Sequence, residues 1–264
     1  MNWEDISEDR RKRELEIYES KAELAELGFD EDEITRQIEG RLSEIREYTG
    51  ETHNEVAIKI NHALGIGSEL WEDMSPVTEK ELALFHSVTD RKIYSVSGIC
   101  DYLAVIREKM LLRIPRGSSL LDFGGSHGHF TLRAVEEGIF VTYADVGDTI
   151  RDYVRWRLNR SYLEADIAPI ENNRCVFNKR KYDYITLLDV ASHLPNLKGY
   201  IDEFYSVLND GGLLIFGDDL FDFNVPWHLE ENKVYRDIEK KKELFKDFEL
   251  VEQLWANCVI LRKG

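Results

Sequence analysis

Apolar residues follow a helical spacing through the first part of the chain. Narrow apolar stripes bordered by dense charge predict two helices before about residue 50, the second of which ends at Gly50. Such stripes suit helices that pack on a main domain or on a second copy of the chain, which would give a homodimer. The pattern is looser over residues 51–97, where Gly65 and Gly67 predict breaks between short helices. A further helix is predicted for residues 97–114.

After residue 113 the pattern changes to alternating strands and helices, which is typical of an α/β protein with a parallel sheet. We therefore divide the chain into an N-terminal helical region, residues 1–112, and a main domain, residues 113–264. The last two strands follow one another without a helix between them, so we expect them to pair antiparallel at one edge of the sheet. The apolar runs predict seven strands, at residues 119–123, 140–145, 163–167, 182–190, 213–219, 248–255 and 257–264.

The glycine-rich stretch after the first strand is the strongest single signal. It reads SLLDFGGSHGHF, with Asp122 at the strand end and Gly124, Gly125 and Gly128 in the turn before a predicted helix. A buried strand, a glycine turn and a helix N-terminus together let a ligand approach the backbone. Two ligand classes use this arrangement, namely dinucleotides and S-adenosylmethionine.

The charge of the stretch favours the second ligand class. Asp122 would repel a pyrophosphate and attract an ammonium or sulfonium group. Ser126 stands where the dinucleotide fingerprint G-x-G-x-x-G has its middle glycine. The sequence D-x-G-G-S-H-G resembles the first motif of class I S-adenosylmethionine-dependent methyltransferases. This resemblance implies a Rossmann-like, seven-stranded mixed sheet with a C-terminal antiparallel hairpin.

Two later segments extend the resemblance over residues 113–264. YDYITLLDVASHLP resembles the strand-four motif of the family, whose common form ends in E-H-x-P, but Ser192 stands here in place of the acid. LNDGGLLIFGDD resembles the next motif, in which a helix ends at a Gly-Gly turn and the chain re-enters the sheet.

The resemblance assigns the cofactor to residues at strand ends. Asp145 would accept hydrogen bonds from ribose hydroxyls, although an acid there also fits a nicotinamide enzyme or a helix cap. Asp166 would accept from the adenine amino group with Ile167 packed on the ring, unless Asp166 is a turn residue before Pro169. The full set of expected cofactor-binding residues is Asp122, Gly124, Gly125, Ser126, Gly128, Asp145, Asp166, Ile167, Leu188 and Asp189.

The acceptor side offers three candidate general bases, because a hydroxyl or protonated amine must lose a proton when it is methylated. His193 follows the fourth strand, His228 lies in VPWHLEEN after the fifth, and Asp219 ends the fifth strand. Histidine titrates near neutral pH, which suits this role. Loop anchoring by His193 and helix capping or cation binding by Asp219 are the alternatives. His86 is expected to be an ordinary histidine.

Composition, charge and the cysteine pattern argue against several other classes of protein. The formal net charge of −17 argues against a nucleic-acid partner, since neutralising phosphates supplies most of that affinity. No apolar run is long enough to span a membrane, and the N-terminus has no apolar signal region. The three cysteines are isolated and show no metal-ligand spacing, so we expect no metal and a cytoplasmic location.

These observations lead to a hypothesis of function. The chain is expected to be an S-adenosylmethionine-dependent methyltransferase that methylates an oxygen or nitrogen of a small molecule, which includes phosphorylated or carboxylated metabolites. The alternatives are a methyltransferase of protein or RNA, and a non-methylating protein that binds a nucleotide or NAD.

Overall fold

The computed structural model describes residues 31–87, 93–94, 107, 110–171, 174–175, 180–217, 227–255 and 258–264. Three predicted features lie outside the described residues: the helix before residue 30, most of the helix over residues 97–114, and Asp219.

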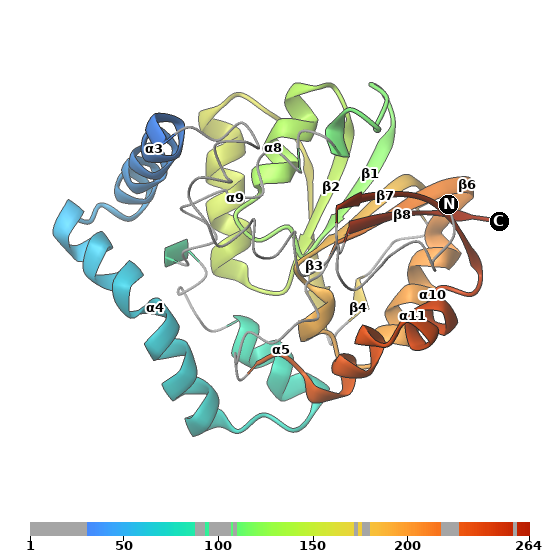
Figure 1. The fold of residues 1–264 in the computed structure, drawn as a ribbon. Helices are drawn as coiled ribbons and strands as arrows, with labels where there is room; N and C mark the ends of the chain where they lie inside the picture. The colour runs from blue at the N-terminus through green and yellow to red at the C-terminus, as the bar shows by residue number, and fades with distance from the viewer. Residues whose placement is uncertain are drawn as a thin grey trace.

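An eight-stranded sheet forms the centre of the structure, in the order β4-β3-β2-β1-β5-β6-β8-β7 (Figure 1). Neighbours from β3 to β6 pair in parallel, while β8 is antiparallel to both β6 and β7. All seven predicted strands are present and the two-residue β4 is an addition, so the predicted Rossmann-like mixed sheet is confirmed. The strands are β1 (Ser119–Phe123), β2 (Phe140–Asp145), β3 (Asp166–Glu171), β4 (Arg174–Cys175), β5 (Tyr182–Leu188), β6 (Leu208–Gly217), β7 (Phe248–Trp255) and β8 (Cys258–Lys263).

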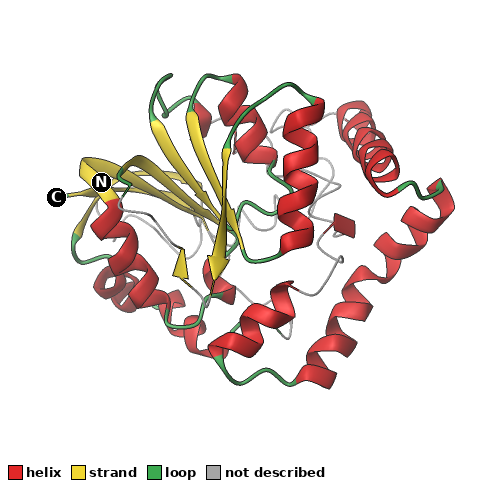
Figure 2. Ribbon diagram, turned by 180° about the vertical axis from the view of Figure 1, so that it is seen from behind, coloured by secondary structure: helices red, strands yellow, loops and turns green. Residues whose placement is uncertain are grey.

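Helices cover both faces of this sheet (Figure 2). Helices α8 (His129–Glu136) and α9 (Asp148–Arg160) pack on one face, and α10 (Leu197–Val207) and α11 (Ile238–Leu244) pack on the other. Strands that are covered on both faces are apolar on both faces, which explains the near-continuous apolar runs in the sequence.

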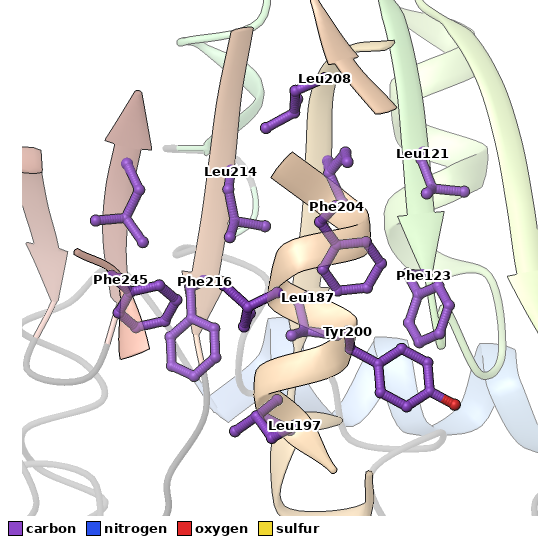
Figure 3. Packing of buried hydrophobic residues seen from close by; sticks show 14 of the residues in the cluster. Leu121, Phe123, Leu187, Leu197, Tyr200, Phe204, Leu208, Leu214, Phe216 and Phe245 are labelled. Atoms are coloured by element: carbon purple, nitrogen blue, oxygen red, sulfur yellow. The ribbon is translucent and has the colours of Figure 1, made fainter. Parts of the chain in front are cut away.

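The larger core lies between the sheet and α10. Leu121 and Phe123 of β1 and Leu187 of β5 point toward this helix, where Tyr200 and Phe204 meet them (Figure 3). The rings of Phe123 and Phe204 lie edge to face, with centroids 4.9 Å apart. Because successive side chains of a strand alternate between faces, Asp122 lies between two residues of this core and faces the opposite side.

Within the described part of the N-terminal region, three helices form an arc outside α9 and across the end of the sheet (Figure 1). They are α3 (Glu31–Thr49), α4 (His53–Met74) and α5 (Glu79–Ser87). Ile45 of α3 is buried against Ile150 and Tyr153 of α9. The second N-terminal helix is therefore present and packs on the main domain, while homodimer formation stays a prediction. No described helix combines the length and the apolar character needed to cross a membrane.

The structure corrects the predicted break in α4. This helix runs without interruption through Gly65 and Gly67, from a capping box at Thr52 and Glu55 to Ser75, which ends it in the left-handed conformation. A glycine inside a helix costs only about 1 kcal/mol, so glycine weakens a helix without ending it when caps and packing support it.

A second helix boundary also differs from the one that the sequence predicts, because the charged run over residues 230–246 indicates one continuous helix. The charged segment 230–246 is not one helix but a 3-10 helix, η4 (Glu230–Arg236), followed by α11. Asp237 is extended and its carboxylate accepts hydrogen bonds from the backbone of Glu239 and Lys240. It is therefore a helix cap, which begins a new helix instead of continuing an old one.

Candidate active site

Four strands of the sheet, β1, β2, β5 and β6, end at one edge, where open α/β sheets bind their ligands. Helix α5 crosses this edge (Figure 1). A Cβ atom added to Gly147, just after β2, would lie 3.6 Å from the backbone oxygen of His86 and 3.7 Å from Ser87. The N-terminal region therefore contributes directly to this edge of the sheet.

The glycine loop, residues 124–128, joins β1 to α8. Gly128 begins α8 with a positive φ of 70°, a conformation that favours glycine. Gly125 has no room for a side chain, because an added Cβ would lie 2.6 Å from Oδ2 of Asp122 and 2.8 Å from the ring of Tyr143. These glycines are thus required by the shape of the loop itself.

Ser126 occupies the tip of the loop in a strained conformation, with a φ of 47°. Three hydrogen bonds hold it there. Its backbone N–H donates to Oδ2 of Asp145 at 3.1 Å, its carbonyl accepts from the Tyr143 hydroxyl at 2.6 Å, and its Oγ lies 3.1 Å from Nδ1 of His127. The loop is therefore fixed to the end of β2.

Asp122 is buried beneath the loop. Its two carboxylate oxygens accept hydrogen bonds from the hydroxyls of Thr131, at 2.6 Å, and Thr186, at 3.0 Å. Burial raises the pKa of this carboxyl, and the two hydroxyls oppose the increase. The carboxylate is thus an internal anchor between α8, β1 and β5.

Asp145 ends β2 and is also buried. Besides the Ser126 N–H, its carboxylate accepts from the backbone N–H of Val146 at 2.8 Å. The Asp145 and Asp122 carboxylates act on each other, since Asp145 contributes to the raised pKa of Asp122. Two acidic groups beneath one loop disfavour a pyrophosphate and favour a cationic ligand.

The two histidines next to Ser126 have defined roles in the loop. Nε2 of His127 lies 3.3 Å from the carbonyl oxygen of Ile93, which can only accept, so Nε2 carries the proton. Nδ1 of His129 lies 3.3 Å from the guanidinium of Arg157, which can only donate, so Nδ1 is the acceptor. Both imidazoles are buried and shape the loop.

The structure overturns the predicted position of Asp166 and Ile167. Strand β3 begins at Asp166 instead of ending near it, and Asp166 pairs with Thr142, three residues before Asp145. The Asp166 side chain is 62% exposed and forms an ion pair with Arg180. Ile167 packs in the apolar cluster under α9, not at the carboxyl edge.

The cause of this error is Pro169, which suggested a strand end. The strand continues through Pro169 to Glu171, because β3 is paired along this part with β2 alone and meets β4 only at its last two residues. A proline, which lacks an N–H donor, is tolerated where a strand is paired on one side.

Leu188 and Asp189 occupy the end of β5. The backbone of Asp189 has a φ of 55° and its N–H donates to the carbonyl of Gly217 at 2.7 Å. The Asp189 residue is exposed at the carboxyl edge, while Leu188 is half-buried and packs toward Gly217 of β6.

Three imidazoles meet beyond the end of β5. His193 belongs to the 3-10 helix η3 (Ala191–His193), and its ring centroid lies 4.8 Å from that of His228 and 5.4 Å from that of His86. The two histidines predicted as bases are thus neighbours. His86, at the end of α5, joins them, which the sequence pattern did not indicate because the contact is between segments far apart in the chain.

Trp227 and Asn232 fix this imidazole cluster of His86, His193 and His228. The Trp227 ring packs 5.9 Å from that of Phe85 of α5. The amide of Asn232 is buried and donates to the carbonyls of Ala191 and Leu194 at 2.8 and 2.9 Å. The segment after β6 is therefore held against η3.

The hydrogen bond of His193 defines which of its nitrogens can accept a proton. Its Nδ1 lies 3.2 Å from the carbonyl oxygen of Trp227, so the neutral ring carries its proton on Nδ1 and its lone pair on Nε2. The pKa of His228 is lowered by burial and, to a lesser degree, by the charges of Lys233 and Arg236. No group of three or more His, Cys, Asp or Glu side chains in the described part of the chain is arranged to hold a metal ion.

Comparison with known protein families gives a match to this chain. A model of a family described as a methyltransferase domain matches residues 98–257. A comparison with curated protein sequences gives no match.

Solved structures with a similar fold include several methyltransferases. An S-adenosylmethionine-dependent methyltransferase from Aquifex aeolicus is 16% identical, with 59% of this chain and 87% of that chain covered and a TM-score of 0.48. The N-methyltransferase NodS from Bradyrhizobium japonicum, in complex with S-adenosylhomocysteine, is 17% identical, with 70% and 97% covered and a TM-score of 0.46. A methyltransferase from Pyrococcus furiosus is 17% identical, with 60% and 82% covered and a TM-score of 0.45.

The family model spans more than half of the chain and includes the glycine loop, the strand ends, His193 and His228, while His86 lies before the matched residues. The chain therefore belongs to the methyltransferase domain family, and it is a class I S-adenosylmethionine-dependent methyltransferase.

Proposed function

We propose that this methyltransferase acts on an oxygen or nitrogen atom of a small molecule held between the glycine loop and the imidazole cluster. The observation that carries the proposal is the meeting of His193 and His228 at the carboxyl edge of the sheet. S-adenosylmethionine supplies an electrophilic methyl group on a sulfonium when it is bound.

The residues around the glycine loop fit such a cofactor. The Asp145 carboxylate stands at the end of β2, where it can accept hydrogen bonds from hydroxyl groups, and the exposed Asp189 stands at the end of β5. The buried acids Asp122 and Asp145 add negative potential beneath the loop, which favours a cationic ligand over a dinucleotide. Asp166 and Ile167 have no part in this proposal, because they lie away from the edge.

The imidazole cluster supports proton removal from the acceptor. With its Nδ1–H directed at the Trp227 carbonyl, His193 presents Nε2 as the basic atom. A lowered pKa keeps His228 neutral at pH 7, so it can also accept a proton. Placing an acceptor in line and removing its proton are the two contributions that a methyltransferase of this kind needs from the protein.

The position of α5 favours a small acceptor. This helix crosses the carboxyl edge, with His86 beside His193 and with Phe85 beside Trp227. A cover of this kind excludes water and limits the size of what can enter. The phosphorylated or carboxylated nature of the acceptor stays a prediction.

Calorimetric titration with S-adenosylhomocysteine, with NAD as the parallel ligand, tests the cofactor assignment. We expect micromolar affinity for S-adenosylhomocysteine and none for NAD. A panel of phenols, catechols, amines and hydroxy acids, assayed by release of S-adenosylhomocysteine, then tests the acceptor class. Methylation of a protein or RNA substrate with no turnover on small molecules would contradict the proposal.

A further inference from the structure

Arg157 of α9 connects the glycine loop to the N-terminal helix α3. One nitrogen of its guanidinium, Nη1, donates to the carbonyl of His127 and to Nδ1 of His129. The other, Nη2, lies 3.2 Å from a carboxylate oxygen of Glu44 on α3. One side chain therefore contacts the loop, the first residue of α8 and a helix outside the sheet.

Because Arg157 is buried, its contact with the glycine loop depends on the negative charge of Glu44. The Arg157 side chain is only 3% exposed, and that of Glu44 is 18% exposed. A buried guanidinium stays charged and is costly to desolvate unless an anion neutralises it. Glu44 supplies that anion, so it keeps Arg157 at the position from which the loop carbonyl is bound.

The contact with His127 is close to the residues proposed to meet the cofactor. The His127 carbonyl lies one residue after Ser126, whose N–H donates to Asp145. The loop is thus held from two sides, by Asp145 at Ser126 and by Arg157 at His127. If the Arg157 side chain moves, the loop loses its support at His127 and keeps the support at Ser126.

We propose that Glu44 is a positioning residue of the cofactor site, which acts through Arg157 to fix the glycine loop in its binding conformation. On this proposal, helix α3 helps to set the geometry of the cofactor site, in addition to packing against α9. The proposal rests on the assignment of the loop to S-adenosylmethionine.

The same pair of helices provides a matched comparison. Glu47, about one turn after Glu44 on α3, pairs with Arg160 of α9 at 2.9 Å. This second ion pair is largely exposed. Arg160 contacts Glu44, Glu47 and the ring of Trp156, none of which belongs to the glycine loop. Ile45 and Tyr48 also pack against α9, so we expect α3 to stay in place when either ion pair is altered.

The experiment compares Glu44→Gln with Glu47→Gln in the full chain. Affinity for S-adenosylhomocysteine is measured by calorimetry, and thermal unfolding is measured without ligand. We expect Glu44→Gln to weaken binding by roughly tenfold, within the usual range for coupling through a contact network, and Glu47→Gln to change it by less than about twofold. A merely structural role would lower the unfolding temperature without this difference in affinity.

A double variant and a conservative variant complete the test. In Arg157→Met, the added Glu44→Gln change should weaken binding no further, because the link is already absent. Glu44→Asp, which keeps the charge, should retain more affinity than Glu44→Gln and replaces it if Glu44→Gln does not fold. Equal affinities for Glu44→Gln and Glu47→Gln in a protein that binds S-adenosylhomocysteine would overturn the inference. A wild-type protein that does not bind S-adenosylhomocysteine would instead contradict the cofactor assignment.

Discussion

The two sides of the carboxyl edge are built in different ways. On the cofactor side, Asp122, Ser126 and Asp145 come from one continuous stretch of strand, loop, helix and strand, and hydrogen bonds join the loop to its neighbours. On the acceptor side, His86, His193 and His228 come from three distant segments, and their rings meet because other groups hold the segments together.

The two kinds of construction suit two different functions, cofactor binding and acceptor binding. A loop that is supported mainly from within one supersecondary unit, with the Arg157–Glu44 link as an added support from outside, suits a cofactor that does not change. A cluster assembled from distant segments depends on tertiary contacts such as Asn232 with η3, which suits an acceptor site. We therefore expect changes on the acceptor side to alter turnover, and changes on the loop side to alter cofactor affinity.

The largest effect is expected for the histidines of the acceptor side. His193→Ala removes the proposed proton acceptor and should lower turnover by roughly 10²–10⁴-fold, the usual contribution of a general base. Affinity for S-adenosylhomocysteine should stay within about twofold, because the ring contacts the Trp227 carbonyl and the rings of His86 and His228 on the acceptor side. His228→Ala is the companion variant. Full turnover in both would show that neither imidazole acts as the base.

A smaller effect is expected for the carboxylate on the cofactor side. Asp145→Ala should weaken S-adenosylhomocysteine binding by roughly 1–3 kcal/mol, because it leaves ligand hydroxyls and the Ser126 N–H without an acceptor. Asp166→Ala is the matched control. Its carboxylate is exposed and lies at the start of β3, three residues before Pro169, which is the residue that pairs with Asp145. Calorimetry measures both, and an equal loss in the two variants would contradict the separation of the two positions.

The smallest effect concerns pH. The pKa of His228 lies below its ordinary value because of burial and the charges of Lys233 and Arg236, so the neutral ring persists to lower pH. Removing one cation with Arg236→Gln should raise this pKa toward its ordinary value, because one of the charges that disfavour the imidazolium is gone. An NMR titration of the imidazole measures the shift, with Lys242→Gln on α11 as control. A shift to lower pH, or an equal shift in the control, would contradict the assigned cause.

The motif residues show how much the sequence could predict. The order and type of the strands, the glycine loop and the acid at the end of β2 follow from local patterns, because strand burial, backbone geometry and the helix start are all decided within a few residues. The same local reasoning failed at Pro169 and at Gly65 and Gly67, where it treated weak breaks as ends. Pairing of β3 with β2, and packing and capping of α4, outweighed those local preferences.

By itself the sequence predicted a Rossmann-like fold, because periodicity and turn chemistry are local properties, and the resemblance of its motifs implied a methyltransferase with a cofactor loop at residues 124–128. Only the tertiary structure decided that His86 meets His193, that Glu44 reaches the loop through Arg157, and that Asp166 lies away from the site. Those contacts depend on how α3 and α5 pack on the sheet and on where β3 begins, and both are set by burial of surfaces that are far apart in the chain.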